Sequence, residues 1–179
     1  MVRLAAAVAS LVALSGCAYM PVRSLVELAR FDIERADPAS MRAFVTLPKV
    51  LRPVPGRSEL TLTIEPGDGS RHERSFRLTT KRTTAGQDAD VHELRLDDAH
   101  LPKMSGFRLE MLARRSVATR TSSMKVAFQP VLCRSGELPA KLRLSASIQL
   151  SNVTEPVPLL ADVDLRSISG DLGTPPACL

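Results

Sequence analysis

Three cysteines are the residues of this 179-residue chain with the clearest chemical potential. Cys17 follows an apolar N-terminal stretch, whereas Cys133 and Cys178 lie in the body and near the C-terminus. The latter two are not in a CxxC arrangement, and neither begins a clear helix that would lower the pKa of a thiol. A redox centre is therefore disfavoured. The odd number requires that one cysteine has a role other than pairing within the chain.

Motifs that would support catalysis are incomplete. Two His-Glu pairs, at 72–73 and 92–93, begin like the zinc motif HExxH, but the fifth positions are Phe76 and Leu96, so neither can place two imidazoles on one helical face. Ser122 and Lys125 match the SxxK pattern, but the companion SDN and KTG motifs are absent, as are GxSxG and P-loop motifs. We therefore expect no catalytic residues, no cofactor and no enzyme activity.

The histidines are the remaining candidates for a metal site. They could meet across neighbouring strands, with nearby aspartates as oxygen ligands. Exposed strand and turn positions explain them more simply, and we expect no metal site. The residues concerned are His72, His92 and His100, with Asp88, Asp90, Asp97 and Asp98.

Charge is unevenly distributed along the second half of the chain. Residues 111–136 contain basic side chains and no acidic one, whereas residues 88–98 contain five acidic side chains and one basic one. The basic stretch is a candidate contact for phosphate headgroups or an acidic protein partner. The alternative is that solvated strand faces and loops balance each other within the chain. The candidate contact residues are Arg114, Arg115, Arg120 and Lys125.

The N-terminus has the layout of an export signal. A minimal basic start that includes Arg3 is followed by residues 4–14, which are apolar except for Ser10. A membrane span needs about 20 apolar residues, so this run fits the hydrophobic region of a signal peptide instead. Directly after it, residues 14–17 read Leu-Ser-Gly-Cys. This tetrapeptide resembles the lipobox of bacterial lipoproteins.

The resemblance covers the first 17 residues, and it implies a lipid anchor. A diacylglyceryl group would be attached to the Cys17 thiol, cleavage would fall after Gly16, and the new amino group would be acylated. Each buried methylene contributes about 0.8 kcal/mol, and two or three chains make a lasting anchor in the bilayer. Ala18 stands where Asp usually signals inner-membrane retention. The resemblance therefore favours the periplasmic face of the outer membrane, and the mature sequence is similar in character to uncharacterised proteobacterial envelope lipoproteins.

Export also bears on the other cysteines and on partners. With Cys17 lipidated, Cys133 and Cys178 form an even pair in an oxidising compartment, so a disulfide is expected. A loop of about 45 residues corresponds to about 4 kcal/mol in the chain-entropy model. Loss of the signal peptide reduces the net charge from +5 to about +4. That charge is too mild for a nucleic-acid partner, and only 3% aromatic residues disfavour stacking on sugars or bases.

The mature chain is expected to form one β domain. Residues 1–16 are the signal peptide, residues 17–40 the lipidated N-terminus and tether, and residues 41–179 the domain. Alternating apolar and polar residues, separated by turn residues such as Gly67 and Gly69, indicate about seven strands. They are expected at 41–47, 60–65, 74–79, 91–96, 126–133, 142–150 and 160–165.

One segment has a helical spacing. Leu101, Met104, Phe107 and Met111 recur at intervals of three and four, which predicts a helix over 98–115, with Asp97 or Asp98 as the cap. The same segment also alternates like a strand over 107–111. The predicted fold is mainly β: an antiparallel β-sandwich of immunoglobulin-like or transthyretin-like kind with one crossing helix.

These observations predict a noncatalytic binding or assembly module of the cell envelope. Its partners would be the lipid bilayer, through acylated Cys17, and an envelope protein complex. Two alternatives remain open: a small envelope hydrolase that uses dispersed Ser, His and Asp residues, and a carrier of lipid or another hydrophobic ligand.

Overall fold

The computed structural model describes residues 37–65, 69–115, 123–149, 155–165 and 175–178. The predicted signal peptide and the tether up to residue 36 lie outside these residues, as does Cys17. Seven strands form one antiparallel sheet in the order β6-β3-β4-β5-β1-β8-β9. Their bounds are β1 (Arg42–Pro48), β3 (Ser58–Glu65), β4 (His72–Ala85), β5 (Ala89–Leu96), β6 (Ser123–Gln129), β8 (Arg143–Gln149) and β9 (Val157–Asp164).

Two short strands form a separate sheet. β2 (Leu51–Pro53) pairs antiparallel with β7 (Leu132–Arg134). The described helical segments are the 3-10 turns η1 (Pro38–Ser40) and η2 (Asp98–His100), and the helix α2 (Leu101–Arg115).

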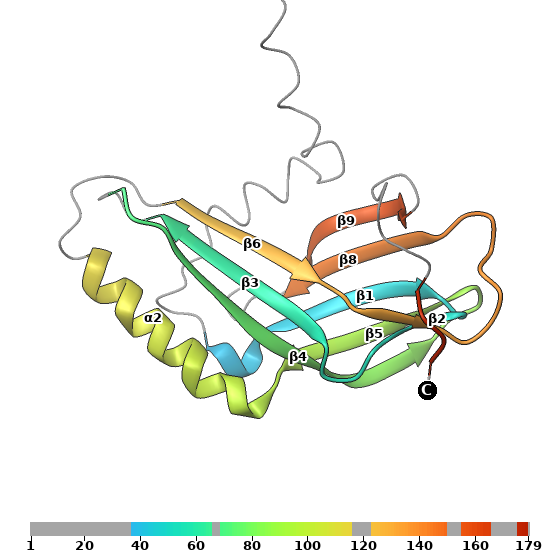
Figure 1. Cartoon of the computed structure of the whole chain (residues 1–179), viewed down its shortest axis with the longest axis horizontal. Coiled ribbons are helices and arrows are strands. Elements are labelled where there is room, and N and C mark those ends of the chain that lie inside the picture. The colour runs from blue at the N-terminus through green and yellow to red at the C-terminus, as the bar shows by residue number, and fades with distance from the viewer. Residues whose placement is uncertain (1–36, 66–68, 116–122, 150–154, 166–174, 179) are drawn as a thin grey trace, which may run out of the picture.

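The mainly β fold with one helix is confirmed, and the seven strands of the large sheet correspond to the seven expected strands. The finer expectation of an immunoglobulin-like or transthyretin-like sandwich is not confirmed, because these strands lie in one continuous sheet that curls on itself (Figure 1). The expected strand over 126–133 is corrected: β6 ends at Gln129, and β7 begins again at Leu132 in the other sheet. Pro130, which has no N–H for a ladder, lies at this break.

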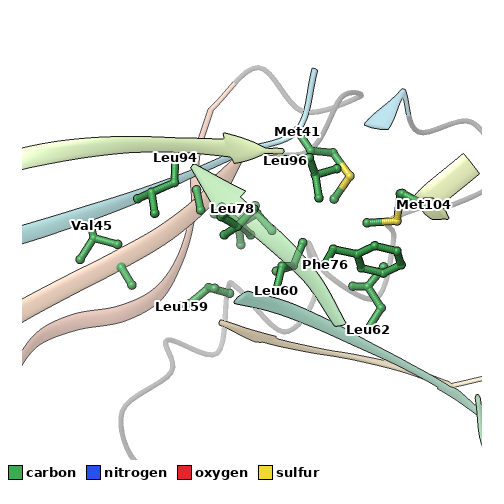
Figure 2. Close-up of a cluster of buried hydrophobic side chains, with 14 of the residues drawn as sticks. Met41, Val45, Leu60, Leu62, Phe76, Leu78, Leu94, Leu96, Met104 and Leu159 are labelled. Carbon is green, nitrogen blue, oxygen red and sulfur yellow. The ribbon is translucent and has the colours of Figure 1, made fainter. Parts of the chain in front are cut away.

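Buried and less buried side chains alternate along the strands because one face of the sheet holds the core. On β1, Ala43, Val45 and Leu47 are buried, and the residues between them are only partly buried. Figure 2 shows such side chains from several strands pointing toward one another, including Leu159 from the far edge strand β9. The curl of the sheet brings both of its ends over one core. We call the buried side the inner face and the opposite side the outer face.

Helix α2 covers part of the inner face. Asp97 caps η2, because its side chain accepts a hydrogen bond from the Ala99 N–H at 2.9 Å. Phe107 packs against Phe76 of β4, with ring centroids 6.0 Å apart and the rings tilted by 55°. Met104 and Met111 are buried beside it, while Leu109 is 60% exposed. The helical interpretation is therefore confirmed over the alternating one.

The C-terminal segment adds to the small sheet. Cys133 and Cys178 are joined by a disulfide with Cα atoms 5.0 Å apart. The Arg134 N–H donates to the Pro176 carbonyl at 2.8 Å, and the Cys178 N–H donates to the Arg134 carbonyl at 2.9 Å. Arg134 and Ala177 thus form a parallel bridge. The C-terminal residues lie beside β7 through both covalent and backbone contacts.

Candidate functional site on the outer face of the sheet

Charged side chains from three neighbouring strands converge on the outer face. Cross-strand pairing places Arg42 of β1 opposite Arg95 of β5, and Glu93 of β5 opposite Arg82 of β4. Glu93 is also opposite Phe44 of β1. Because side chains two residues apart on a strand share a face, all of them project to the outer side. We call Arg42, Arg82, Glu93 and Arg95 the arginine cluster.

The cluster is centred on the Glu93 carboxylate, whose side chain is only 4% exposed. Arg95 donates from Nε to Glu93 Oε1 at 2.8 Å, and its Nη2 lies 2.8 Å from the same oxygen. Arg82 Nη2 lies 3.2 Å from Oε2, and Arg42 Nε lies 3.7 Å from Oε1. A single buried carboxylate therefore holds three guanidinium groups together.

A β-bulge determines which cation faces Glu93. Regular pairing continued from Leu78 and Leu96 would place Lys81 opposite Glu93, but the register shifts between Thr80 and Arg82. This extra residue in β4 brings Arg82 to that position instead. An arginine presents a planar fork of donors that suits a carboxylate, whereas a lysine presents a point charge.

The electrostatics of the cluster favour an ionised Glu93. Burial by itself raises the pKa of this carboxyl group, but the hydrogen bond from Arg95 and the charges of the three guanidiniums outweigh burial. The pKa of Glu93 is therefore held below its ordinary value of 4.5. With one negative charge against three positive ones, two positive charges have no counter-charge within 4 Å among the described residues.

The other side of β5 carries a buried histidine. His92 is 3% exposed, and its Nδ1 forms a hydrogen bond with Thr83 Oγ1 at 3.0 Å. Its Nε2 is buried and has no hydrogen-bond partner among the described residues. The bulge that places Arg82 opposite Glu93 also places Thr83 opposite His92. Burial lowers the pKa of His92, and the charge of Arg52 adds to this effect, while Asp90 opposes it.

A shallow pocket of about 400 Å³ opens farther along the outer face. Thr46 and Pro48, which follow Arg42 on the outer side of β1, are among its lining residues. Asp162 lies at its wall with a φ of 51° and pairs with Arg143. The Asp162 N–H donates a hydrogen bond to Ser145 Oγ at 2.9 Å. The outer face thus carries both a positive cluster and a recess.

The residues expected to contact an anionic partner are only partly described. Arg114 and Arg115 lie in the last turn of α2, but their side chains are outside the described part, as is Arg120 altogether. Lys125 lies on β6, where its Nζ is 3.3 Å from Glu65 Oε1. Ser122 of the SxxK pattern also falls outside the described residues.

The three histidines do not meet in the structure. His72 contacts Ser70 and lies 3.8 Å from Glu110 of α2, whereas His100 Nδ1 accepts a hydrogen bond from the Arg77 N–H. His92 contacts Thr83. Within the described ranges, no group of three or more His, Cys, Asp or Glu residues is placed to hold a metal ion.

Sequence reasoning missed the arginine cluster because its members are far apart along the chain. The signal that could have found them is the alternation of β1 and β5, which puts Arg42, Glu93 and Arg95 on the polar side, but the pairing of strands is needed to bring them together.

No family model, curated protein or solved structure matches the chain. In the described part of the chain, the helices lack the length and apolar character that crossing a membrane requires.

Proposed function

We propose that this chain is a lipid-anchored, noncatalytic binding or assembly module of the bacterial cell envelope. The lipobox-like residues before Cys17 support attachment to the bilayer, with the domain on the periplasmic side of the outer membrane. The Cys133–Cys178 disulfide supports export to an oxidising compartment, because such bonds persist there and are rare in the cytosol.

The arginine cluster is the observation that carries the binding function. Among the described residues, the hydrophobic core and α2 occupy much of the inner face. The outer face instead presents Arg82, which is 70% exposed, together with Arg42 and Arg95, each 38% exposed. Rigid strands hold these groups in place, which reduces the entropy lost when a partner binds.

The anchor is tested with Cys17→Ser. The wild-type chain is expected to incorporate labelled palmitate and to fractionate with outer membranes, whereas Cys17→Ser is expected to lose the label and to appear in the soluble periplasm. An unlabelled wild-type chain, or a variant that stays with the membrane, would contradict the proposed anchor.

The binding face is tested by crosslinking in native membranes. A photo-crosslinking residue is introduced at Thr84, whose neighbour across the ladder is Val91 on the outer face. The matched control carries the same residue at Leu109, an exposed position on α2. A defined envelope partner captured from Thr84 and not from Leu109 supports the proposal. Capture from Leu109 alone would contradict it.

A further inference from the structure

We propose that the arginine cluster binds a phosphate-type oxyanion on the outer face of the sheet. This inference deepens the proposed binding function and rests on it. It names the chemistry that the face recognises.

The arginine cluster carries an excess of positive charge. Glu93 neutralises one of three guanidiniums, and among the described residues no second carboxylate lies within 4 Å of the three. The two positive charges that remain match a phosphate monoester or inorganic phosphate, which carries close to two negative charges at neutral pH. A carboxylate ligand would balance only one of them.

The arginine cluster has hydrogen-bond donors that Glu93 does not use. Arg95 directs two nitrogens at Glu93, whereas Arg42 lies at 3.7 Å, beyond hydrogen-bond distance, and Arg82 contributes one nitrogen at 3.2 Å. Each guanidinium has five N–H donors, so most donors of Arg42 and Arg82 remain for a ligand. Their planar forks suit the oxygens of a phosphate group.

The arginine cluster is preorganised for a ligand. Three like charges repel each other, and the buried Glu93 carboxylate holds them on neighbouring strands without a ligand. Neutral hydroxyl side chains border the cluster, since Thr79 lies opposite Arg95 and Ser147 lies opposite Phe44. An incoming oxyanion therefore meets fixed donors and no described negative side chain other than Glu93 at the cluster.

The experiment uses the mature chain carrying Cys17→Ser, so that the lipid anchor does not itself bind vesicles. Inorganic phosphate is titrated at constant ionic strength while the side-chain Nε–H signals of arginine are followed by NMR. In parallel, flotation compares vesicles of phosphatidylcholine alone with vesicles that also contain phosphatidic acid. Saturable shifts of Arg42 and Arg82 support binding of free phosphate, and flotation with phosphatidic acid alone supports phosphate carried by a lipid.

Arg82→Gln is the decisive variant, because this side chain is largely exposed and its loss leaves the Arg95 hydrogen bond to Glu93 in place. In whichever of the two measurements shows binding, the affinity of Arg82→Gln for phosphate or for phosphatidic acid vesicles is expected to fall about tenfold. Arg74→Gln is the matched control, because it removes the same charge from an exposed residue of β4 outside the cluster. The Arg74 guanidinium donates to the backbone carbonyl of Glu73 and not to Glu93. This variant is expected to bind phosphate like the parent chain. Arg42→Gln provides a second test of the cluster.

The inference is overturned if neither arm shows binding, or if the two cluster variants bind as tightly as Arg74→Gln. The proposed function fails separately, because palmitate labelling and crosslinking from Thr84 are measured on the wild-type chain without added phosphate. A chain that remains anchored and crosslinked but does not bind phosphate would refute only this inference.

Discussion

Arg82 and Glu93 face each other across β4 and β5 because β4 carries one residue more than regular pairing requires. That residue has consequences on both faces of the sheet. Without the shift, Arg82 would oppose His92 in place of Thr83, and the hydrogen bond between Thr83 Oγ1 and His92 Nδ1 would be lost. The bulge separates a charged pair on the outer face from a neutral one on the inner face.

Deletion of Lys81 is expected to preserve both pairs. The shortened β4 would pair regularly, with Arg82 still opposite Glu93 and Thr83 still opposite His92. The lost ion pair between Lys81 and Asp98 is exposed and 4.0 Å long, so the free energy of unfolding should change by less than about 1 kcal/mol. Urea denaturation monitored by circular dichroism measures this change.

Deletion of Thr80 is the matched control. It would place Lys81 opposite Leu94, which is 1% exposed on the inner face, and a loss of about 1–3 kcal/mol is expected. Equal destabilisation by the two deletions would show that the bulge does not determine which residues of β4 pair with Glu93 and His92.

The sequence predicted those elements whose one face is buried. The alternation of Leu60, Leu62 and Ile64 marks β3, and the spacing of Met104, Phe107 and Met111 marks α2, because burial imposes a period on apolar residues. The second half of β4 has no such pattern, since residues 81–85 are exposed, and the expected strand ended too early. β2 and β7 are too short to show a period.

The arginine cluster lies beyond this kind of reasoning for a different reason. Arg42, Arg82 and Glu93 come from three strands, and their meeting depends on strand order and on a one-residue shift in register. Neither property is encoded in local periodicity. The basic run near Lys125 predicted a contact for an anionic partner because it is continuous in sequence, yet Lys125 is paired with Glu65.

The buried His92 is expected to make the folded state sensitive to mild acid. Burial lowers the pKa of His92 below its ordinary value of 6.5, so the unfolded chain binds a proton more readily than the folded one. Stability should therefore fall as the pH drops below about 6.5, with a slope of up to about 1.4 kcal/mol per pH unit. Denaturation in urea at pH 7.5, 6.5 and 5.5 measures the slope.

His92→Leu is expected to remove that slope, while His100→Gln, which leaves His92 in place, should retain it. The contribution of Glu93 has a separate window. Its pKa is lowered from 4.5, so the stability that its ionised form supplies is present above about 4.5 and is lost only at lower pH. A slope between pH 7.5 and 5.5 that persists in His92→Leu would show that another group is responsible.

Docking of α2 on the inner face should depend on Phe107. Phe107→Ala removes a buried ring that contacts Phe76, and a loss of about 3–5 kcal/mol is expected from the missing contacts and the cavity. Leu109→Ala, on the exposed side of the same helix, is expected to change stability by less than about 0.5 kcal/mol. Thermal and urea unfolding compare the two variants. Similar losses for both would mean that the helix presents a different side to the sheet.

The disulfide should stabilise the domain by restricting the unfolded chain. The closed loop spans a sequence separation of 45, for which chain entropy gives about 4 kcal/mol. The double variant Cys133→Ser/Cys178→Ser is expected to lose about that amount, and reduction of the wild-type chain with dithiothreitol should bring it to the same denaturation midpoint. Because the Arg134 backbone bonds to the C-terminal segment do not need the sulfurs, the folded structure should remain intact in mild conditions. If reduction left the midpoint unchanged, the two sulfurs would not be bonded in the purified protein, and the disulfide would no longer support export to an oxidising compartment.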